Sequence, residues 1–486
     1  MNFSQLQPNR LWHFFEQLNA IPRPSKKEDA VRDWVVHLGH SWGFHTATDE
    51  VGNVLIRKPG ARGLEGSQTV VLQSHLDMVC QKNNDTSFDF ETQGIDMFID
   101  GDWVRARGTT LGADNGIGVA AILALLESTE IPHPPLEALF TIDEETGMTG
   151  ALGLKGGFLT GSVLFNLDTE DDDELSIGCA GGVDVTSIGT YETEVVVQGM
   201  MGIELSITAG SGGHSGMDIH KGIANVNKLM NRMLLEINEA VDIRICSVEG
   251  GGLRNAIPRE SASKFIVAPE DIEEAQELAQ VVFEAIKSEY STTDPGLKMS
   301  ILRLENAPES AMNEETQLAL LWSIQACPVG IHRMSPDIPN LVQTSNNLAR
   351  VKIAEGSIVI QCLCRSSVDS EKDDHARSIA ACFALAGLDT EFSGDYPGWT
   401  PNPKSAVVKM MNQLYEEKYG ECPRVLACHA GLECGILGTN YPSMDMVSFG
   451  PNIRGAHSPD ECVQISSVQK FWDFLQDALK RIPRAA

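Results

Sequence analysis

Histidine and carboxylate side chains recur in this sequence at points where short apolar runs end. His75 and Asp77 come directly after the run 69–73, Glu144 and Glu145 follow 136–142, and Asp168 closes 163–167. Short apolar runs are typical of buried strands, and open α/β sheets gather their ligand sites at the carboxyl ends of strands. Imidazoles and carboxylates brought together at such an edge form a mixed nitrogen and oxygen set that suits zinc, cobalt or manganese.

Two further segments extend this set of side chains. Asp114 stands in LGADNG, at the mouth of the apolar run 116–126, which is long enough for a buried helix, and His457 follows the last predicted strand, 444–449. A single histidine or aspartate after a strand is usually a turn or cap residue. Five segments that deliver such groups to one edge of one sheet instead favour a metal site.

Spacing within these segments indicates roles. Alternation along an extended segment places His75 and Asp77 on one side, so the carboxylate can accept the second N–H of the imidazole. Adjacent Glu144 and Glu145 cannot both easily bind one ion, so one is expected as a ligand and the other as a general base. Five ligands exceed what one catalytic zinc needs. Two metals about 3.5–4 Å apart that share one bridging carboxylate fit better.

The elements that must position these groups alternate between strand and helix. Strand-like runs and helical runs succeed each other at both ends of the chain, which predicts an α/β catalytic domain with a mixed, mostly parallel sheet flanked by helices. The middle of the chain instead has long amphipathic helices, among them 220–238 and 271–288, separated by polar strand-like pieces. We therefore expect an inserted α+β lid domain, which is large enough to be a duplicated unit. The expected ranges are 1–185 and 391–486 for the catalytic domain and 186–390 for the lid.

Composition narrows the function classes. The 486 residues are 42% hydrophobic and 21% charged, an ordinary globular balance, and the formal net charge is -30. So much negative charge repels phosphate backbones and anionic lipids, so we expect neither nucleic acid nor a membrane as a partner. No apolar run reaches the ~20 residues of a membrane span, no signal peptide is visible, and the eleven scattered cysteines favour reduced thiols. A cytoplasmic protein is the expectation.

The motifs together resemble a known family. His75-Leu76-Asp77, Gly112–Gly116, Glu144–Gly147, Asp168 and His457 are similar, in chain order, to the motifs of the di-zinc exopeptidases. That clan includes carnosinases, dipeptidases, tripeptidases, aminoacylases and glutamate carboxypeptidases. The strings LGADNGIG, GGHSG, LRNAIPRE, HAGLECG and HSPDE look like those of its bacterial cytosolic dipeptidases, the aminoacyl-histidine or carnosinase-like subfamily.

The resemblance implies a role for each residue of the set. Asp114 would bridge two Zn²⁺ ions, for which Co²⁺ or Mn²⁺ can substitute, and the peptide bond after it would be cis. His75 and Asp168 would complete one metal site, and Glu145 and His457 the other. Asp77 would orient His75, and Glu144 would be the general base for a metal-bridging hydroxide that attacks the peptide carbonyl.

Four residues are candidates for substrate binding. His214, in GGHSG of the expected lid, resembles a family histidine that holds the tetrahedral oxyanion, and Asn255 resembles a lid asparagine near the substrate. Arg365 ends a strand-like run and could bind a free carboxylate with both arms of its guanidinium, or it is a surface charge. Glu433 either binds the substrate ammonium group or caps a turn.

These observations predict a di-zinc peptidase that hydrolyses unblocked dipeptides, including Xaa-His dipeptides such as carnosine. An aminoacylase, a tripeptidase or another amide deacylase of the same clan is the alternative, since a sequence does not give pocket dimensions. A non-catalytic metal-binding scaffold is a remote alternative, because Glu144 and all five ligand positions are present. The expected partner is a small peptide. A homodimer is the other partner considered, although a doubled lid could supply within one chain what smaller lids obtain from a partner subunit.

Overall fold

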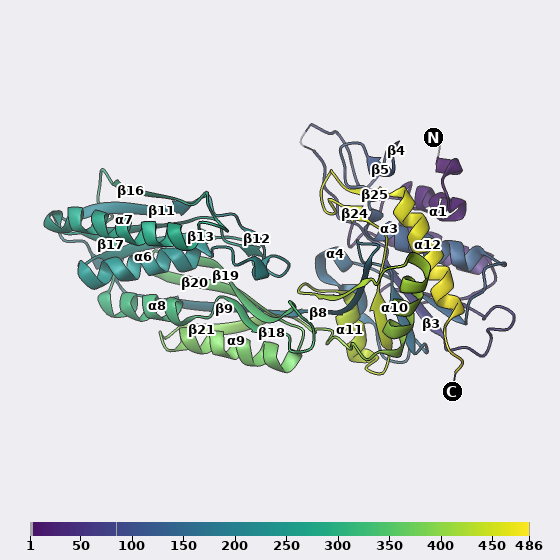
Figure 1. Ribbon diagram of the computed structural model, residues 1–486. Helices are drawn as coiled ribbons and strands as arrows, with labels where there is room; N and C mark the ends of the chain where they lie inside the picture. The colour runs from purple at the N-terminus through teal and green to yellow at the C-terminus, as the bar shows by residue number, and fades with distance from the viewer. Residues whose placement is uncertain (1–2, 84, 486) are drawn as a thin grey trace. The chain divides into compact units, whose positions relative to one another are not determined.

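The computed structural model describes residues 3–83 and 85–485, which form two compact units (Figure 1). Of these residues, the first unit comprises those up to 178, 401–427 and those from 432 on, and the second comprises 179–400 with 428–431. The chain therefore leaves the first unit near 178 and returns near 400, whereas the sequence placed these points at 185 and 390. The short return of 428–431 to the second unit has no counterpart in the expected ranges.

A mixed eight-stranded sheet forms the centre of the first unit. Its strand order is β1-β2-β6-β3-β7-β23-β8-β22, in which β6, β3, β7 and β23 run parallel to one another. The bounds are β1 His45–Thr48, β2 Val54–Lys58, β3 Val70–His75, β6 Leu136–Thr141, β7 Val163–Asn166, β8 Glu174–Cys179, β22 Arg424–Cys428 and β23 Asp445–Ser448. Every residue of β3, β6 and β7 is buried, as expected for parallel strands covered on both faces. The mixed, mostly parallel sheet is confirmed.

Helices cover this sheet, and α3 is the most buried of them. It spans Ala113–Glu127, its residues 115–126 are all buried, and it packs against β3 and α1. This agrees with the apolar run 116–126, which has no polar face to expose. The other helices of the unit are α1 Asn9–Asn19, α2 Asp29–Ser41, α4 Glu144–Gly147, α5 Thr149–Gly153, α10 Ala406–Tyr419, α11 Glu433–Asn440 and α12 Ile465–Lys480. A small sheet of order β24-β25-β5-β4 completes the unit, with β4 Met97–Asp100, β5 Trp103–Ala106, β24 Ile453–Arg454 and β25 Cys462–Gln464.

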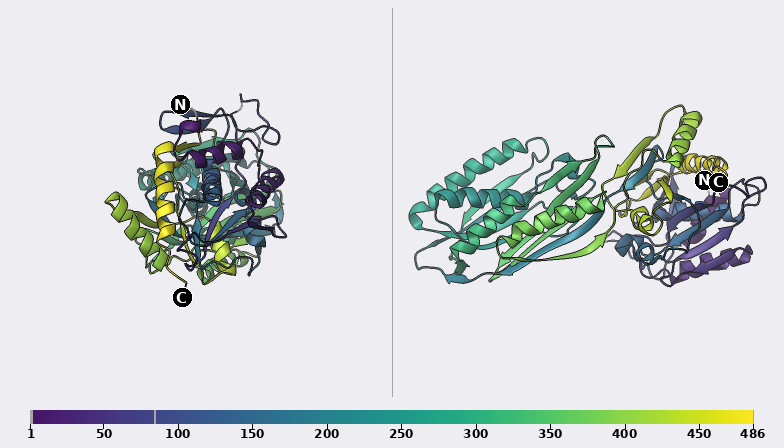
Figure 2. Two further views of the ribbon diagram at one scale, coloured as in Figure 1. Left: turned by 90° about the vertical axis from the view of Figure 1, so that its right-hand side faces the viewer. Right: turned by 90° about the horizontal axis from the view of Figure 1, so that it is seen from below.

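The second unit is an α+β unit built on one long antiparallel sheet. The strand order is β16-β11-β15-β13-β19-β20-β9-β21, and β18 pairs with β19. Burial alternates along β9 and β11, so one face of the sheet carries the core, and Figure 2 shows the helices gathered on one side of it. The strands are β9 Gly181–Thr190, β11 Met201–Thr208, β13 Arg244–Gly251, β15 Ser261–Val267, β16 Lys298–Arg303, β18 Gly330–Met334, β19 Val342–Ala354, β20 Ser357–Ser366 and β21 Asp389–Tyr396. The helices are α6 Val226–Ala240, α7 Ile272–Glu289, α8 Glu314–Ala326 and α9 Asp369–Ala384.

One predicted helix begins later than its sequence suggested. The amphipathic pattern placed a helix start at His220, but α6 begins at Val226. Gly222 has a φ of 66°, which ends the preceding turn, and the side chain of Asn225 accepts a hydrogen bond from Lys228 N as the helix cap. None of the helices within 3–83 and 85–485 is both long and apolar enough to cross a bilayer.

Candidate active site

The expected metal ligands all lie in the first unit, at the carboxyl ends of the parallel strands. His75 is the last residue of β3, Glu144 and Glu145 open α4 after β6, and Asp168 follows β7. Strands β3, β6 and β7 pair in register, so their ends are adjacent. Asp114 lies at the start of α3, and the loop between β24 and β25 carries His457.

Asp114 stands between the two histidines. Its Oδ1 lies 3.2 Å from His75 Nε2, and its Oδ2 lies 3.3 Å from His457 Nε2. Asp168 Oδ1 is 3.5 Å from His75 Nε2, and Glu145 Oε2 is 3.1 Å from His457 Nε2. The peptide bond between Asp114 and Asn115 is cis, as the resemblance implied. The structure thus brings all five expected ligands together around one shared carboxylate.

Two triads of this cluster have the donor set of a divalent-metal site. His75, Asp114 and Asp168 form one, and Asp114, Glu145 and His457 form the other; within each triad the ligand atoms lie within 4.8 Å of one another. Among the residues that the structure describes, Glu145 Oε1 and Asp168 Oδ1 are buried and receive no hydrogen bond of normal geometry. Buried anionic oxygens without donors are costly unless a cation binds them. The residues present therefore fit two divalent cations.

Electrostatics supports the same interpretation. Hydrogen bonds to Asp114 and Glu145 raise the pKa of His457 to about 11. A histidine held in its protonated form by two carboxylates marks a place where positive charge is required. Divalent cations would supply that charge and leave the imidazole neutral, which is the state in which it acts as a ligand.

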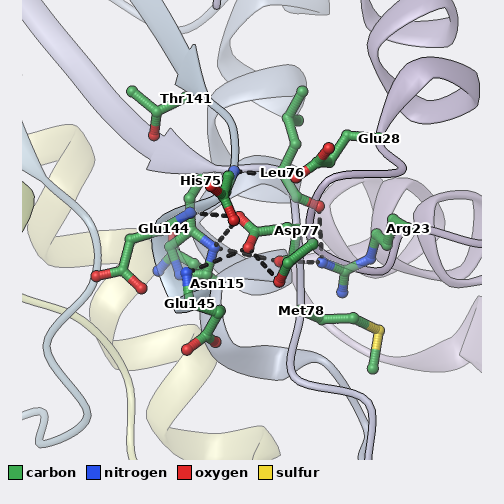
Figure 3. Close-up of polar contacts among 12 residues, drawn as sticks. Arg23, Glu28, His75, Leu76, Asp77, Met78, Asn115, Thr141, Glu144 and Glu145 are labelled. Carbon is green, nitrogen blue, oxygen red and sulfur yellow. Dashed lines mark hydrogen bonds and ion pairs between the residues drawn. The ribbon is translucent and has the colours of Figure 1, made fainter. Parts of the chain in front are cut away.

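Asp77 connects His75 to both glutamates (Figure 3). Its Oδ1 lies 3.3 Å from His75 Nδ1 and accepts a hydrogen bond from Glu144 N at 3.1 Å, while its Oδ2 accepts from Glu145 N at 3.2 Å and Ser25 Oγ at 2.7 Å. Burial alone would raise the pKa of Asp77, but the hydrogen bonds from His75 and Ser25 hold it at about 2. The carboxylate therefore stays ionised, orients the imidazole and fixes the first turn of α4.

Glu144 has a place suited to proton transfer. Its carboxylate oxygen lies within 4.8 Å of ligand atoms of both His75 and Glu145, and its backbone is held by Asp77. Burial, followed by the neighbouring carboxylates Asp168 and Glu433, raises the pKa of Glu144 well above its ordinary value. The structure differs from the sequence-based expectation in one detail. Glu144 and Glu145 stand on a helical turn, whereas the sequence suggested an extended turn.

Glu433 lies in the same unit but is fully buried. It opens α11, and its Oε2 accepts hydrogen bonds from Gln73 Nε2 at 2.6 Å and from Thr141 Oγ1 at 2.7 Å. Burial raises its pKa to about 8. These contacts hold the Glu433 carboxylate at the ends of β3 and β6, since Gln73 belongs to β3 and Thr141 is the last residue of β6.

The acidic run after Asp168 is ion-paired. Asp171 and Asp173 contact Arg424 at 3.0 and 2.7 Å, and Asp172 contacts Lys470 at 2.8 Å. Asp168 alone of these four aspartates lies beside His75. The position of Asp168 agrees with its choice as the ligand expected from the end of the third strand.

Three of the expected substrate residues lie in the second unit: His214 on a short strand, Asn255 in the turn before its partner strand, and Arg365 on β20. His214 pairs with Ala256, the residue after Asn255, and Asn255 O accepts a hydrogen bond from Ser215 N at 2.8 Å. Nδ1 of His214 accepts hydrogen bonds from Gly216 N at 3.1 Å and Met217 N at 3.0 Å. Burial and the nearby Arg365 lower the pKa of His214. The imidazole is therefore neutral with its proton on Nε2, which makes it a hydrogen-bond donor.

Arg365 is buried, not a surface charge. Its Nη1 donates to Tyr396 Oη at 2.7 Å, and its Nε lies 3.4 Å from Ser215 Oγ, but no described carboxylate forms an ion pair with it. Arg365, Gly182 and Tyr396 lie opposite one another across β20, β9 and β21. A Cβ at Gly182 would lie 2.6 Å from Tyr396 Oη, so the glycine lets the tyrosine reach the guanidinium. A buried cation without a carboxylate partner is ready to bind an anion.

Sequence reasoning missed several residues that hold the site. Arg23 donates to carbonyl groups of the segments that carry Asp77 and Asp114, Glu28 Oε1 accepts from Asp143 N at 2.9 Å, and Glu461 binds the backbone before Asp114. His429, which lies 2.7 Å from Ser345 Oγ in the second unit, was not singled out either. Glu461 lies in the string HSPDE and His429 in HAGLECG, and this membership was the one sign in the sequence that could have pointed to them. The sequence around Arg23 and Glu28 offered no such sign.

The sheet, the shared aspartate and the two histidine–carboxylate triads define a class of metal-dependent hydrolase. Comparison with known proteins gives the family: residues 71–481 match peptidase family M20/M25/M40, and the chain belongs to it. It is 42% identical over 480 residues to the cytosol non-specific dipeptidase of Escherichia coli, with 99% of each chain covered.

Solved structures agree with this assignment. Aminoacylhistidine dipeptidase from Vibrio alginolyticus is 42% identical and superposes with a TM-score of 0.94 over 100% of this chain and 99% of that one. An aminopeptidase from Bacillus cereus, at 14% identity, has a TM-score of 0.57 over 98% of this chain and 99% of its own, which shows a shared fold. The chain is thus a metallopeptidase by family and by fold.

Replacing His457 by alanine is expected to lower metal content by about one ion per chain, because the triad of His75, Asp114 and Asp168 remains. Elemental analysis of the purified variant after gel filtration measures this. His45→Ala, a histidine exposed on the edge strand β1, is the matched control and should keep the full content. Unchanged metal content in His457→Ala would remove this histidine from the ligand set.

Proposed function

We propose that this chain is a two-metal dipeptidase that hydrolyses unblocked dipeptides, among them Xaa-His dipeptides such as carnosine. The observation that carries the proposal is 42% identity across 99% of both chains to a protein named as a cytosol non-specific dipeptidase, joined to a complete set of metal ligands. Zinc is the proposed metal, since its ligands are imidazole nitrogens and carboxylate oxygens. A cytoplasmic location belongs to the same proposal and is supported by the name of that relative.

The proposed mechanism assigns one task to each side chain. Bound divalent cations would polarise the peptide carbonyl and lower the pKa of a water molecule, which makes that water a better nucleophile after it loses a proton. Glu144 takes the proton of that water and returns it to the leaving amine, and Asp77 keeps His75 and the glutamate turn in place. Nε2–H of His214 donates to the developing oxyanion.

Recognition of the substrate termini falls to the second unit in this proposal. Arg365 binds the free carboxylate, supported by its burial without an ion-pair partner, and Tyr396 orients the guanidinium. Asn255, exposed beside the His214 loop, is proposed to contact the substrate near the scissile bond. The second unit is therefore proposed to be the substrate-binding lid domain that the sequence predicted. Glu433, which accepts hydrogen bonds from Gln73 and Thr141, stays a candidate for binding the substrate ammonium group.

Hydrolysis of carnosine, Gly-Gly, an N-acetyl amino acid and a tripeptide, each with metal-depleted and zinc-reconstituted protein, tests the function. Zinc-dependent cleavage of the two unblocked dipeptides alone is the expected result. Preferential cleavage of the N-acetyl amino acid or the tripeptide would point to an aminoacylase or a tripeptidase and would overturn the proposed specificity.

A homodimer stays a prediction, which light scattering on the purified protein checks.

Arg365→Met is expected to raise KM for Gly-Gly by about 10²-fold, since a charge-assisted hydrogen bond contributes about 1.5–3 kcal/mol. Activity on a C-terminally amidated dipeptide should change far less, because that substrate has no carboxylate to lose. Arg350→Met, at a half-buried position of β19 in the same sheet, is the control. Equal losses on the free and amidated substrates would argue against a carboxylate-binding role for Arg365.

A further inference from the structure

Glu461 makes an unusual set of contacts with the segment that leads into Asp114. Its Oε2 accepts hydrogen bonds from Leu111 N at 2.8 Å and Gly112 N at 2.9 Å, and its Oε1 accepts from Ala113 N at 2.7 Å and Asp114 N at 3.2 Å. The side chain is 3% exposed. The first N–H groups of a helix have no acceptor within the helix, so one carboxylate here satisfies four successive donors at the start of α3.

Arg23 contacts carbonyl groups of the same segment and of the residues that follow β3, and Figure 3 shows it beside Leu76 and Asp77. Its Nη1 donates to Leu76 O at 3.0 Å and Asp77 O at 2.9 Å, and its Nη2 donates to Gly112 O at 2.6 Å. The guanidinium is 1% exposed. Gly112 is thus bound on both sides, with its N–H on Glu461 and its C=O on Arg23. Its φ of 70° and the 2.4 Å from a built Cβ to Arg23 Nη2 explain why a glycine stands there.

Each of the two charges links a different pair of ligand-bearing segments. Arg23 ties the end of β3, which carries His75, to the segment that carries Asp114. Glu461 lies on the loop between β24 and β25, which also carries His457, and ties that loop to the same segment. Arg23 thus connects the segment of Asp114 to that of His75, and Glu461 connects it to that of His457.

We propose that Arg23 and Glu461 are positioning residues that hold the Asp114 carboxylate between His75 and His457, where it would be a ligand of both metal sites. An apolar pair of the same volume would fill the space but would leave four N–H and three C=O groups without these partners. Groups that orient metal ligands typically contribute 10–100-fold in metal affinity. The inference rests on the proposed metal site but not on the proposed substrate.

The test measures metal affinity without any substrate. Zinc dissociation constants of Glu461→Gln and Arg23→Lys are determined by competition with a chromophoric chelator, and Co²⁺-loaded protein is examined by absorption spectroscopy. We expect zinc binding weaker by about 10–100-fold and a changed Co²⁺ spectrum in both variants. Glutamine presents an NH₂ donor to two N–H groups, and lysine lacks the fork that reaches Leu76 O and Gly112 O together.

Glu137 and Arg57 provide a matched control in the same unit. Glu137 is 1% exposed, accepts hydrogen bonds from Thr160 N at 2.8 Å and Gly161 N at 2.9 Å, and pairs with Arg57 at 2.9 Å, yet it lies near the opposite end of β6. Glu137→Gln and Arg57→Lys should lower Tm without changing zinc affinity. If Glu461→Gln lowers Tm as they do and keeps wild-type zinc affinity, the proposal is wrong.

Folding failure is controlled by a conservative variant. If Glu461→Gln does not fold, Glu461→Asp replaces it in the test. Aspartate keeps the charge but has a shorter side chain, so zinc binding should weaken measurably, by less than the loss expected for Glu461→Gln. Wild-type zinc affinity in a folded Glu461→Asp and in Arg23→Lys would also overturn the proposal. Because no substrate is used, failure of the dipeptidase assignment and failure of this inference give different results.

Discussion

Glu144→Gln is expected to lower kcat by about 10²–10⁴-fold while metal content stays at the wild-type level. The substitution keeps the shape of the side chain and removes its ability to take a proton. It leaves both triads that share Asp114 intact, and the backbone bond from Glu144 N to Asp77 is also preserved. Steady-state kinetics on Gly-Gly and elemental analysis of the same preparation measure the two quantities.

Two further variants make this result specific. Glu144→Asp keeps a base but withdraws it from the reacting atoms, so it should retain more activity than Glu144→Gln. Glu130→Gln, at an exposed position after α3, should behave as wild type. A Glu144→Gln enzyme that keeps wild-type kcat would rule out the proposed general base, and one that loses metal would show that Glu144 acts as a ligand.

The clustering of the expected ligands could be predicted from the sequence because most of them stand beside a periodic element. His75 ends a strand in which every residue is buried, and Asp114 precedes a helix whose apolar run has no polar face. Parallel strands bring their carboxyl ends to one edge, so residues 93 positions apart, His75 and Asp168, meet there. Local pattern and topology therefore carry most of the information about this site.

The residues that hold the ligands in place could not be predicted in the same way. Arg23 acts through carbonyl groups of Leu76, Asp77 and Gly112, and any residue type at those positions offers a carbonyl. Glu461 acts through backbone N–H groups 347 to 350 positions away. Contacts between a side chain and a backbone far away in the chain produce no recognisable pattern of residue types or spacing in the sequence.

The second unit illustrates a different limit. Its helix α7 coincides closely with the amphipathic run 271–288. The burial of Arg365, however, depends on Gly182 and Tyr396, which come from two neighbouring strands. The bulge in the pairing of β21 with β9, between Ser393 and Tyr396, sets the register that puts the tyrosine opposite Gly182. Register shifts of this kind follow from tertiary packing, so the sequence alone left Arg365 equally compatible with the surface.

Asp114→Asn is expected to remove more metal than any substitution of a ligand that serves one triad. Each carboxylate oxygen of Asp114 faces a different histidine, at 3.2 and 3.3 Å. Asparagine keeps one oxygen, loses the charge and places an NH₂ group where the second ion would bind. Metal content should therefore fall below that of His457→Ala, and kcat/KM should fall by about 10²-fold or more, since metal polarisation contributes several kcal/mol and 1.36 kcal/mol is tenfold.

Comparing the metal content of several variants tests whether Asp114 is a bridging ligand. Elemental analysis of Asp114→Asn, His457→Ala and Asp102→Asn is done side by side; Asp102 binds Ser466 outside the metal triads and should keep wild-type content. The backbone N–H of residue 114 can still donate to Glu461 in the asparagine variant, so the fold of the variant should be retained. Equal metal content in Asp114→Asn and His457→Ala would mean that Asp114 serves one ion, and the shared-carboxylate arrangement would then be wrong.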